Sequence, residues 1–239
     1  MLFKDGLEIE RAMVVFAHPD DAEWGSAGTS AAWADQGVEV TYVLVTNGAS
    51  GSSDPDMTRE RLTGIRMAEQ RAAADIVGAK SLVTLGFEDG YLYPTLELRK
   101  AVAREIRRFR PDVVISHDPT ARTAMGAYIN HPDHLAVGET VMRSINPDAS
   151  SGLMFPELWK EEGLAPHLPK ALFLASFGDG ETWVDISSTI DRKIEALLCH
   201  QSQMPEAGEI ETWVRERFAA AGKRFGVDFA ETYRMFRVG

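Results

Sequence analysis

Cysteine, basic residues and long apolar runs are all scarce in this 239-residue chain, and each shortage excludes a class of protein. The single cysteine, Cys199, permits no intrachain disulfide, which is typical of proteins from a reducing compartment. Lys and Arg together number 25 against 36 Asp and Glu, so the net charge is −11. A chain this acidic is a poor partner for nucleic acids and for anionic lipid surfaces. We therefore expect neither a nucleic-acid partner nor a membrane partner.

No stretch of the sequence approaches the ~20 apolar residues that a membrane-spanning helix requires. The first residues, MLFKDGLEIER, also lack the apolar segment of a signal peptide. These two observations predict a soluble, cytoplasmic protein. The sequence does not determine the oligomeric state, and a homo-oligomer stays open.

Short apolar segments alternate with helix-like segments along the chain, which is typical of βαβ units around a parallel sheet. The predicted strands are residues 13–16, 38–45, 81–85, 113–116 and 170–176. The predicted helices are residues 26–36, about 58–77, 95–109, 131–144, 188–200 and 209–221. No repeat or shift in composition marks a second domain. The sequence predicts one α/β domain over residues 1–239, with an irregular excursion at about 146–169 that is rich in Pro and Gly.

The segment MVVFAHPDDAE, residues 13–23, combines a buried strand with a cluster of polar residues at its end. The carboxyl ends of parallel strands are where ligands bind in open α/β sheets. Pro19 restricts the backbone at itself and at His18, so the chain must bend there. Through that bend, His18 and Asp21 can converge on one point while Asp20 is directed elsewhere. We interpret this segment as one half of a metal site.

The other half is NHPDH, residues 130–134, at the start of the helix after the fourth strand. His131 and His134 are three residues apart, so they share a face if that turn is helical. The loops after the first and fourth strands end at the same edge of a parallel sheet. A catalytic zinc ion typically takes three protein ligands and leaves a fourth position for water. Two imidazoles and one carboxylate, from His18, Asp21 and His134, would supply that set.

Two further side chains of these loops, Asp20 and His131, would then lie beside the metal without binding it. Amide hydrolysis needs a carboxylate that takes a proton from the attacking water and an imidazole that protonates the leaving amine. Asp133 is placed to orient His131. Each half of the motif alone is more typical of a helix cap or a surface loop, but the two halves together favour a metal site.

Four motifs resemble those of the LmbE/PIG-L family of zinc-dependent N-acetylglucosaminyl de-N-acetylases. They are HPDD at residues 18–21, Arg66-x-x-Glu69, HPDH at 131–134 and KIEALLCHQSQ at 193–203. The resemblance covers about residues 13–203. It implies a Rossmann-like three-layer α/β/α sandwich with a mainly parallel sheet, and removal of an N-acyl group, most often acetyl, from an amino sugar or its conjugate.

The resemblance also implies roles for individual residues. Zinc would be bound by His18, Asp21 and His134, with Fe²⁺ or another divalent ion acceptable to the same ligands. Asp20 would be the general base, and His131, supported by Asp133, the general acid or oxyanion stabiliser. The positions that hold sugar hydroxyls in the family correspond to Arg66 and Asp89. Tyr128, three residues before His131, is a further candidate for contact with the substrate, although one branch of the family places this Tyr two residues before.

Several alternatives stay open at this point. The protein could be an amidase acting on a thiol conjugate, a deacylase that tailors a natural product, or a non-catalytic small-molecule-binding domain on the same scaffold. The absence of GxGxxG and GxxxxGK[ST] leaves a nucleotide-dependent enzyme without support. A binding domain has no need of an acid and a base, so Asp20 and His131 argue for an enzyme.

The remaining polar and aromatic candidates have less specific signals. Arg66 and Glu69 are expected to form a buried ion pair, with Arg66 reaching the ligand. His117 would either line the cleft or form a structural hydrogen bond, and His200 would anchor the end of its helix. Among the tryptophans, the better candidates for a wall of the cleft are Trp24 and Trp159.

Overall fold

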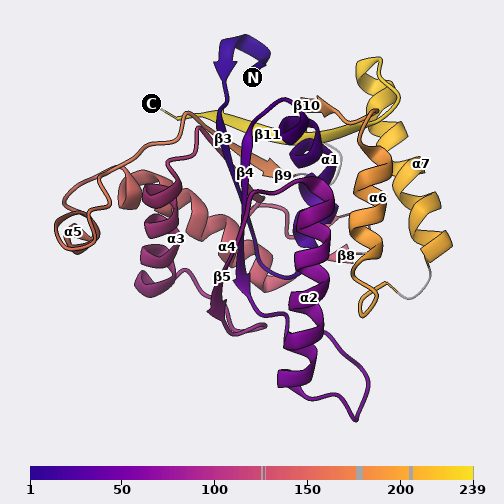
Figure 1. The fold of residues 1–239 in the computed structure, drawn as a ribbon, viewed down its shortest axis with the longest axis horizontal. Coiled ribbons are helices and arrows are strands. Elements are labelled where there is room, and N and C mark those ends of the chain that lie inside the picture. Colours follow the sequence, from indigo (N-terminus) through magenta and orange to yellow (C-terminus); the bar gives the residue numbers. More distant parts are fainter. Residues whose placement is uncertain (125, 127, 176–179, 205–206, 239) are drawn as a thin grey trace.

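The computed structural model describes residues 1–124, 126, 128–175, 180–204 and 207–238. Its centre is a seven-stranded sheet in the order β10-β11-β9-β6-β3-β4-β5 (Figure 1). The strands, in that order, are Thr182–Asp185, Ala230–Arg237, Ala171–Ala175, Val113–His117, Arg11–Phe16, Glu39–Thr46 and Ser81–Phe87. The five strands from β9 to β5 are parallel, and β11 is antiparallel to both of its neighbours.

The larger helices cover both faces of this sheet. They are α1 (Asp21–Asp35), α2 (Arg59–Val77), α3 (Leu96–Phe109), α4 (Pro132–Arg143), α6 (Ile190–Leu198) and α7 (Ala207–Phe225). Short elements complete the chain: β1 (Leu2–Phe3), η1 (Lys4–Gly6), β2 (Leu7–Glu8), β7 (Thr123–Ala124), β8 (Tyr128–Ile129), η2 (Ser144–Ala149) and α5 (Pro156–Lys160).

Alternating residues of the strands supply a separate core on each face. In β3, Val14 and Phe16 pack in the cluster that contains α1, α2, α6 and α7. Their neighbours Met13 and Val15 pack in the cluster that contains α3 and α4. Successive side chains of a strand point to opposite faces, so a fully apolar strand serves both cores. The fold is therefore the predicted three-layer α/β/α sandwich with a mainly parallel sheet.

The helix caps follow the sequence closely. Thr58 and Thr95 each accept a hydrogen bond at the start of a helix, from Arg61 N and Leu98 N. Gly78 ends α2 with a φ of 79°, a left-handed conformation that glycine adopts without strain. Within the described residues, every helix is too short or too polar to span a bilayer.

The structure corrects the sequence prediction at the start of helix α1, at strand β10, which was not predicted, and at the C-terminal segment. Helix α1 begins at Asp21 rather than at residue 26, so the second carboxylate of HPDD lies in its first turn. The C-terminal segment 230–237 forms a strand that the sequence reading did not predict, and it inserts antiparallel between β9 and β10. The excursion at 146–169 contains only a part of η2 and the short helix α5.

Candidate metal centre and active site

The two halves of the motif meet where strands β3 and β6 end. These strands are parallel neighbours, so the loop with His18 and the loop with His134 leave the same edge of the sheet. Asp20 has a φ of 96°, a left-handed conformation in which Asp is tolerated better than most residues. The resulting turn brings the Asp21 carboxylate back to its own loop, where Oδ2 accepts a hydrogen bond from His18 N at 2.7 Å.

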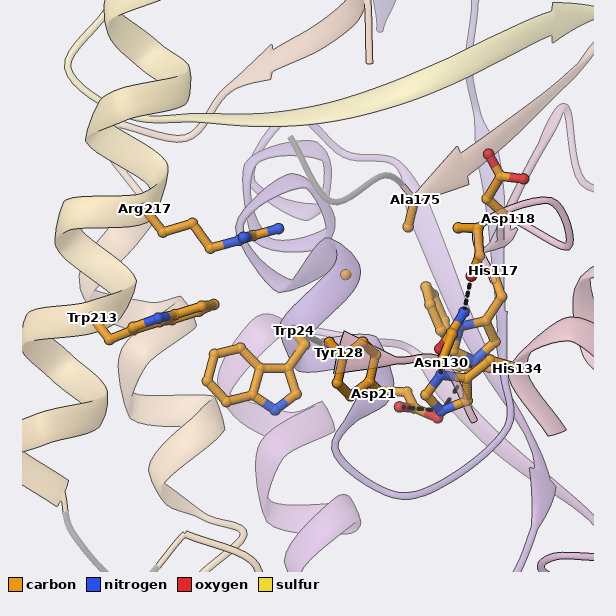
Figure 2. A pocket seen from close by; sticks show the side chains of 13 residues that line it. Asp21, Trp24, His117, Asp118, Tyr128, Asn130, His134, Ala175, Trp213 and Arg217 are labelled. Carbon is orange, nitrogen blue, oxygen red and sulfur yellow. Dashed lines mark hydrogen bonds and ion pairs between the residues drawn. The ribbon is translucent and has the colours of Figure 1, made fainter. Parts of the chain in front are cut away.

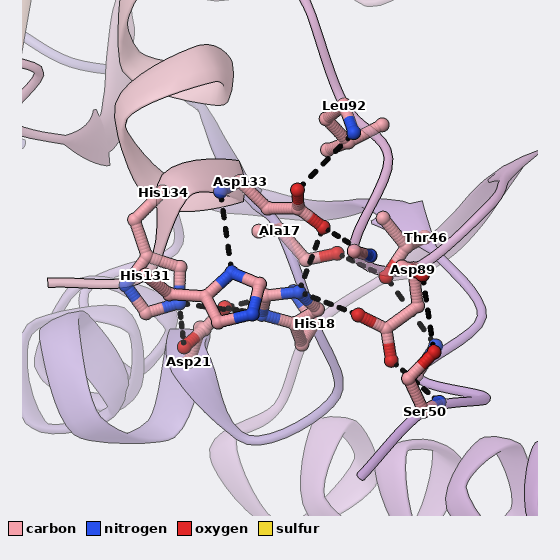
Figure 3. A network of polar contacts seen from close by, with 12 residues as sticks. Ala17, His18, Asp21, Thr46, Ser50, Asp89, Leu92, His131, Asp133 and His134 are labelled. Atoms are coloured by element: carbon pink, nitrogen blue, oxygen red, sulfur yellow. Dashed lines mark hydrogen bonds and ion pairs between the residues drawn. The ribbon is translucent and has the colours of Figure 1, made fainter.

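Three ligand atoms converge on one point at this edge (Figure 3). Nδ1 of His18 lies 3.1 Å from Asp21 Oδ2 and 3.2 Å from Nε2 of His134. Nε2 of His134 lies 3.1 Å from Asp21 Oδ1. Ligands about 2.0–2.1 Å from a tetrahedral zinc ion are about 3.3 Å apart, so these separations are close to what the ion requires. The predicted ligands fit a divalent cation without rearrangement of the backbone.

In both His18 and His134, the ring nitrogen that faces away from this point lies close to an oxygen atom that orients the imidazole. His18 Nε2 lies 3.1 Å from Asp89 Oδ1 and 3.2 Å from Asp133 Oδ2. His134 Nδ1 lies 2.8 Å from Asn130 Oδ1. Carboxylate or carbonyl acceptors on the far nitrogen are the usual way in which proteins hold metal-binding histidines.

The charges around His18 favour a cation. Burial alone would lower the pKa of His18, but hydrogen bonds to Asp133, Asp21 and Asp89 outweigh it and raise that pKa to about 12. Three carboxylates around one imidazole therefore favour a positive charge at this point. A divalent ion would supply that charge, since the ligand nitrogen would then lose its proton to the metal.

Asp20 lies next to this group and faces a buried arginine. Burial, and then the negative charge of Asp21, raise the pKa of Asp20 to about 7. A carboxyl with a pKa near neutrality suits a general base. Arg66 Nη2 lies 3.5 Å from Asp20 Oδ2, and the same guanidinium donates to Pro19 O at 2.6 Å and to Gly48 O at 3.0 Å. Arg66 thus joins the loop that carries Asp20 to the loop after β4.

The expected ion pair between Arg66 and Glu69 does not form. The Glu69 carboxylate instead accepts hydrogen bonds from Ser202 N at 2.8 Å and from Ser202 Oγ at 2.7 Å. Side chains three residues apart on a helix can meet. Here, however, Arg66 donates to the loops after β3 and β4, and Glu69 accepts from the HQSQ segment.

His131 is the N-cap residue of α4, and its ring faces His18. Its Nδ1 accepts a hydrogen bond from Asp133 N at 3.2 Å, so in the neutral ring the proton is on Nε2. The rings of His131 and His18 pack edge to face with centroids 4.7 Å apart. Burial and the charge of His18 lower the pKa of His131. The predicted role of His131 as acid needs a donor nitrogen, and Nε2 is that nitrogen.

Asp133, which was predicted to orient His131, contacts that ring through its backbone N–H and directs its carboxylate elsewhere. That carboxylate contacts His18 and accepts from Gly90 N at 2.7 Å and from Leu92 N at 3.1 Å. In the first turn of α4, the backbone N–H of Asp133 donates to His131, while the side chain of Asp133 points toward the loop after β5. Asp133 therefore positions His18 through its side chain and His131 through its backbone.

The two other candidates for substrate contact differ in their surroundings. Asp89 is only 4% exposed, and its Oδ2 accepts a hydrogen bond from Ser50 N at 2.8 Å. Each carboxylate oxygen of Asp89 already has a partner and can accept a further hydrogen bond, so contact with a sugar hydroxyl stays a prediction. Tyr128 lies on β8 and is 39% exposed, and it lines a cavity together with His134. The placement of Tyr128 is compatible with its predicted role, and that of Asp89 argues for support of His18.

Two histidines outside the ligand group have structural contacts. Nε2 of His117 accepts a hydrogen bond from Ala17 N at 3.1 Å, and its ring stacks on His134 with centroids 4.1 Å apart. Burial, and then the proximity of His134, lower the pKa of His117 to about 3, so this ring is neutral. His200 lies 3.0 Å from the buried Glu23 carboxylate, and it anchors the end of its helix as predicted.

A cavity of about 170 Å³ opens beside the ligands (Figure 2). Its described lining residues are Phe16, Asp21, Trp24, Gly25, His117, Asp118, Ala121, Tyr128, Asn130, His134, Ala175, Trp213 and Arg217. Trp24 was predicted as a wall. Trp213 and Arg217, on α7, were missed because nothing in their spacing shows which side of the sheet edge the last helix covers.

The sequence profile of PIG-L, described as GlcNAc-PI de-N-acetylase, matches residues 13–145, more than half of the chain. A diacetylchitobiose deacetylase of Thermococcus kodakarensis is 31% identical over 232 residues, which cover 95% of this chain and 83% of that relative. The chain belongs to the PIG-L family.

Other members agree in sequence and in structure with this PIG-L chain. A probable N-acetyl-alpha-D-glucosaminyl L-malate deacetylase of Bacillus anthracis is 32% identical and covers 80% of each chain. The structure of an N,N'-diacetylchitobiose deacetylase from Pyrococcus horikoshii superimposes with a TM-score of 0.88 at 28% identity, and covers 99% of this chain and 86% of that one. The predictions of family and fold are confirmed.

Proposed function

We propose that this protein is a zinc-dependent hydrolase that removes an N-acyl group, most often acetyl, from an amino sugar or an amino-sugar conjugate. One observation carries the proposal: His18 Nδ1, the Asp21 carboxylate and His134 Nε2 converge within 3.2 Å of one another. The named activities of the family members, which deacetylate N-acetylated amino sugars, support the choice of substrate.

The side chains around the ligands fit the steps of amide hydrolysis. A divalent metal held by His18, Asp21 and His134 would polarise the acyl carbonyl and acidify water. Asp20 takes the proton of the attacking water, and Arg66 holds the loop that presents Asp20. The proton that Asp20 has taken then passes to the leaving nitrogen, and the His131 Nε2–H donates a hydrogen bond to the acyl oxygen as negative charge develops on it.

Zinc is the metal that we propose, because two imidazoles and one carboxylate with an open fourth position are a common catalytic zinc set. The same donors accept Fe²⁺ and other divalent ions. A cytoplasmic location and a homo-oligomeric state stay predictions. Amidases of thiol conjugates and deacylases of natural products would share this site and differ in the pocket beside it.

The test is a panel of N-acetylated sugars and conjugates, including N-acetylglucosamine, N,N'-diacetylchitobiose and a thiol conjugate. Free amine is measured in the zinc-loaded protein, in the chelated protein and in the Asp20→Asn variant. We expect amine release that requires the metal and Asp20. Failure of the zinc-loaded protein to release amine from any member of the panel would contradict the proposal and favour the non-catalytic binding domain.

A further inference from the structure

The cavity beside the metal ligands extends away from them toward the last helix. It begins at Asp21 and His134 and continues past Trp24 to Trp213 and Arg217 on α7 (Figure 2). Helix α7 lies outside residues 13–145, the part that matches the family profile. The far wall of this cavity is thus supplied by a segment outside the part of the chain that matches the family profile.

The far wall is aromatic. The rings of Trp24 and Trp213 pack edge to face with centroids 5.2 Å apart. The Arg217 guanidinium lies 5.1 Å from the centroid of the Trp213 ring, a cation–π contact that fixes the orientation of the indole. Phe16 and Ala175 add further apolar surface near the ligands.

Two polar side chains of the lining already have partners within the protein. The Asp118 carboxylate accepts from Thr120 N at 2.8 Å and from Arg234 Nη1 at 2.6 Å. Asn130 binds His134 through Oδ1 and donates to Ala121 O at 2.7 Å. Apolar contact is therefore the main interaction that these walls offer a ligand.

The position of the acid and the base indicates which part of a substrate enters. Asp20 and His131 are not among the described residues that line the cavity. Arg66, the predicted contact of the sugar hydroxyls, is also absent from the described lining. The acyl substituent is bonded to the side of the carbonyl carbon opposite the sugar nitrogen, so it is the part of the substrate left to enter the cavity between Asp21 and Trp213.

The size of the cavity exceeds what an acetyl group fills. An apolar cavity of about 150 Å³ holds a molecule of the size of benzene. The cavity here measures about 170 Å³, and the methyl of an acetyl group would occupy only a small part of it. Unfilled apolar surface contributes nothing to binding, whereas each buried methylene contributes about 0.8 kcal/mol.

We propose that this cavity is the acyl pocket, and that the enzyme prefers N-acyl groups with an apolar substituent of about six carbon atoms over N-acetyl. Trp24 and Trp213 are then the residues that determine acyl specificity. This inference rests on the proposed hydrolase activity and deepens it by naming the acyl class.

The experiment compares N-acetyl-, N-butyryl- and N-phenylacetylglucosamine with the full-length, zinc-loaded protein. All three release glucosamine, so one amine assay measures every kcat/KM. We expect kcat/KM for the phenylacetyl substrate to exceed that for the acetyl substrate by about tenfold, with butyryl in between. N,N'-Diacetylchitobiose is included as a substrate with the same acyl group and a second sugar.

Three variants test whether the cavity causes this preference. Trp213→Ala removes an aromatic wall and Ala175→Leu fills space near the ligands, so each is expected to lower the phenylacetyl-to-acetyl ratio about tenfold. Trp159→Ala is the matched control, because Trp159 is a half-exposed tryptophan of α5 outside the described lining, and the ratio is expected to stay unchanged.

Different failures have different meanings. A wild-type preference for acetyl that Ala175→Leu does not alter would overturn the acyl pocket and leave the hydrolase proposal intact. A preference for diacetylchitobiose over N-acetylglucosamine that Trp213→Ala abolishes would assign the cavity to the second sugar instead, and would also overturn the inference.

Binding to the zinc-loaded Asp20→Asn variant separates the inference from the hydrolase proposal. Calorimetry is expected to show about tenfold tighter binding of N-phenylacetylglucosamine than of N-acetylglucosamine. Equal affinities would overturn the acyl pocket. If this preference were found but the wild type hydrolysed neither compound, the cavity assignment would stand and the hydrolase proposal would fail.

Discussion

Two of the clusters of buried charge that contact helix α1 differ in their balance, because the protein itself neutralises the charge in one of them and not in the other. In the first, Lys193 Nζ donates to Glu231 Oε1 at 2.7 Å and to the carbonyls of Glu23 and Trp24. Glu231 also accepts hydrogen bonds from two backbone N–H groups of α1 and from the Tyr233 hydroxyl. Each charge there has an opposite charge and a set of hydrogen bonds.

The second cluster, at the carboxyl edge of the sheet, has an excess of negative charge. Three carboxylates, those of Asp21, Asp89 and Asp133, contact the single imidazole of His18. The ligand atoms converge on a point instead of pairing off. The Lys193–Glu231 ion pair is satisfied within the protein and is structural. The convergent, unbalanced group around His18 is instead suited to a cation from outside the protein. Each of the following predictions tests that difference.

The largest expected effect follows removal of a ligand at the unbalanced cluster. His18→Ala and His134→Ala should each abolish retention of the metal after dialysis and reduce amine release to background, because two ligands hold the ion too weakly. Metal content per chain is measured by elemental analysis. His167→Ala is the control, since His167 bonds Pro111 O away from the ligands. One equivalent of zinc retained by both ligand variants would refute the assignment.

Removal of the base should impair the rate without loss of the metal. Asp20→Asn is expected to lower kcat by about 10²–10⁴, since the amide cannot accept the proton of the attacking water. His131→Ala should fall in the same range. Steady-state kinetics and metal analysis on the same samples check both statements. A fall in activity that merely follows lost zinc would remove Asp20 from the role of base.

The balanced cluster should affect stability rather than metal binding. Lys193→Met leaves the fully buried Glu231 without its cation, which is expected to cost about 3–5 kcal/mol of the free energy of unfolding. Urea denaturation measures this loss. The double variant Lys193→Met/Glu231→Gln should recover part of it, because no charge is left unpaired. Equal stability of the single variant and the wild type would show that the pair is not the structural element described here.

The smallest effect is expected at the carboxylates behind His18. Asp89→Asn and Asp133→Asn should each weaken zinc binding about 10–100-fold, since the amide orients the imidazole less strongly. Competition with a chelator of known affinity measures the change. The exposed neighbour Glu88 offers a control in Glu88→Gln, for which no change is expected. Unchanged zinc affinity in both Asn variants would mean that neither carboxylate contributes to the orientation of the His18 imidazole.

The convergence of the two HPD motifs could be predicted from the sequence, because it depends only on which parallel strands are neighbours. The contacts of Asp133 could not, since the same residue offers its backbone to His131 and its side chain to His18 and the loop after β5. The aromatic wall could not be predicted either. Trp213 lines the cavity from α7, which packs against β11, and the antiparallel pairing of β11 with β9 has no signal in the spacing of the parallel units.

The central claim is that one cation is held between the loops after β3 and β6. Anomalous diffraction at the zinc edge from crystals of the zinc-loaded protein tests it most directly. The account predicts a single peak about 2.0–2.2 Å from His18 Nδ1, an oxygen of Asp21 and His134 Nε2. A peak instead among His18 Nε2, Asp89 and Asp133, which also lie close enough together to bind an ion, would contradict it, as would the absence of any peak at this edge of the sheet.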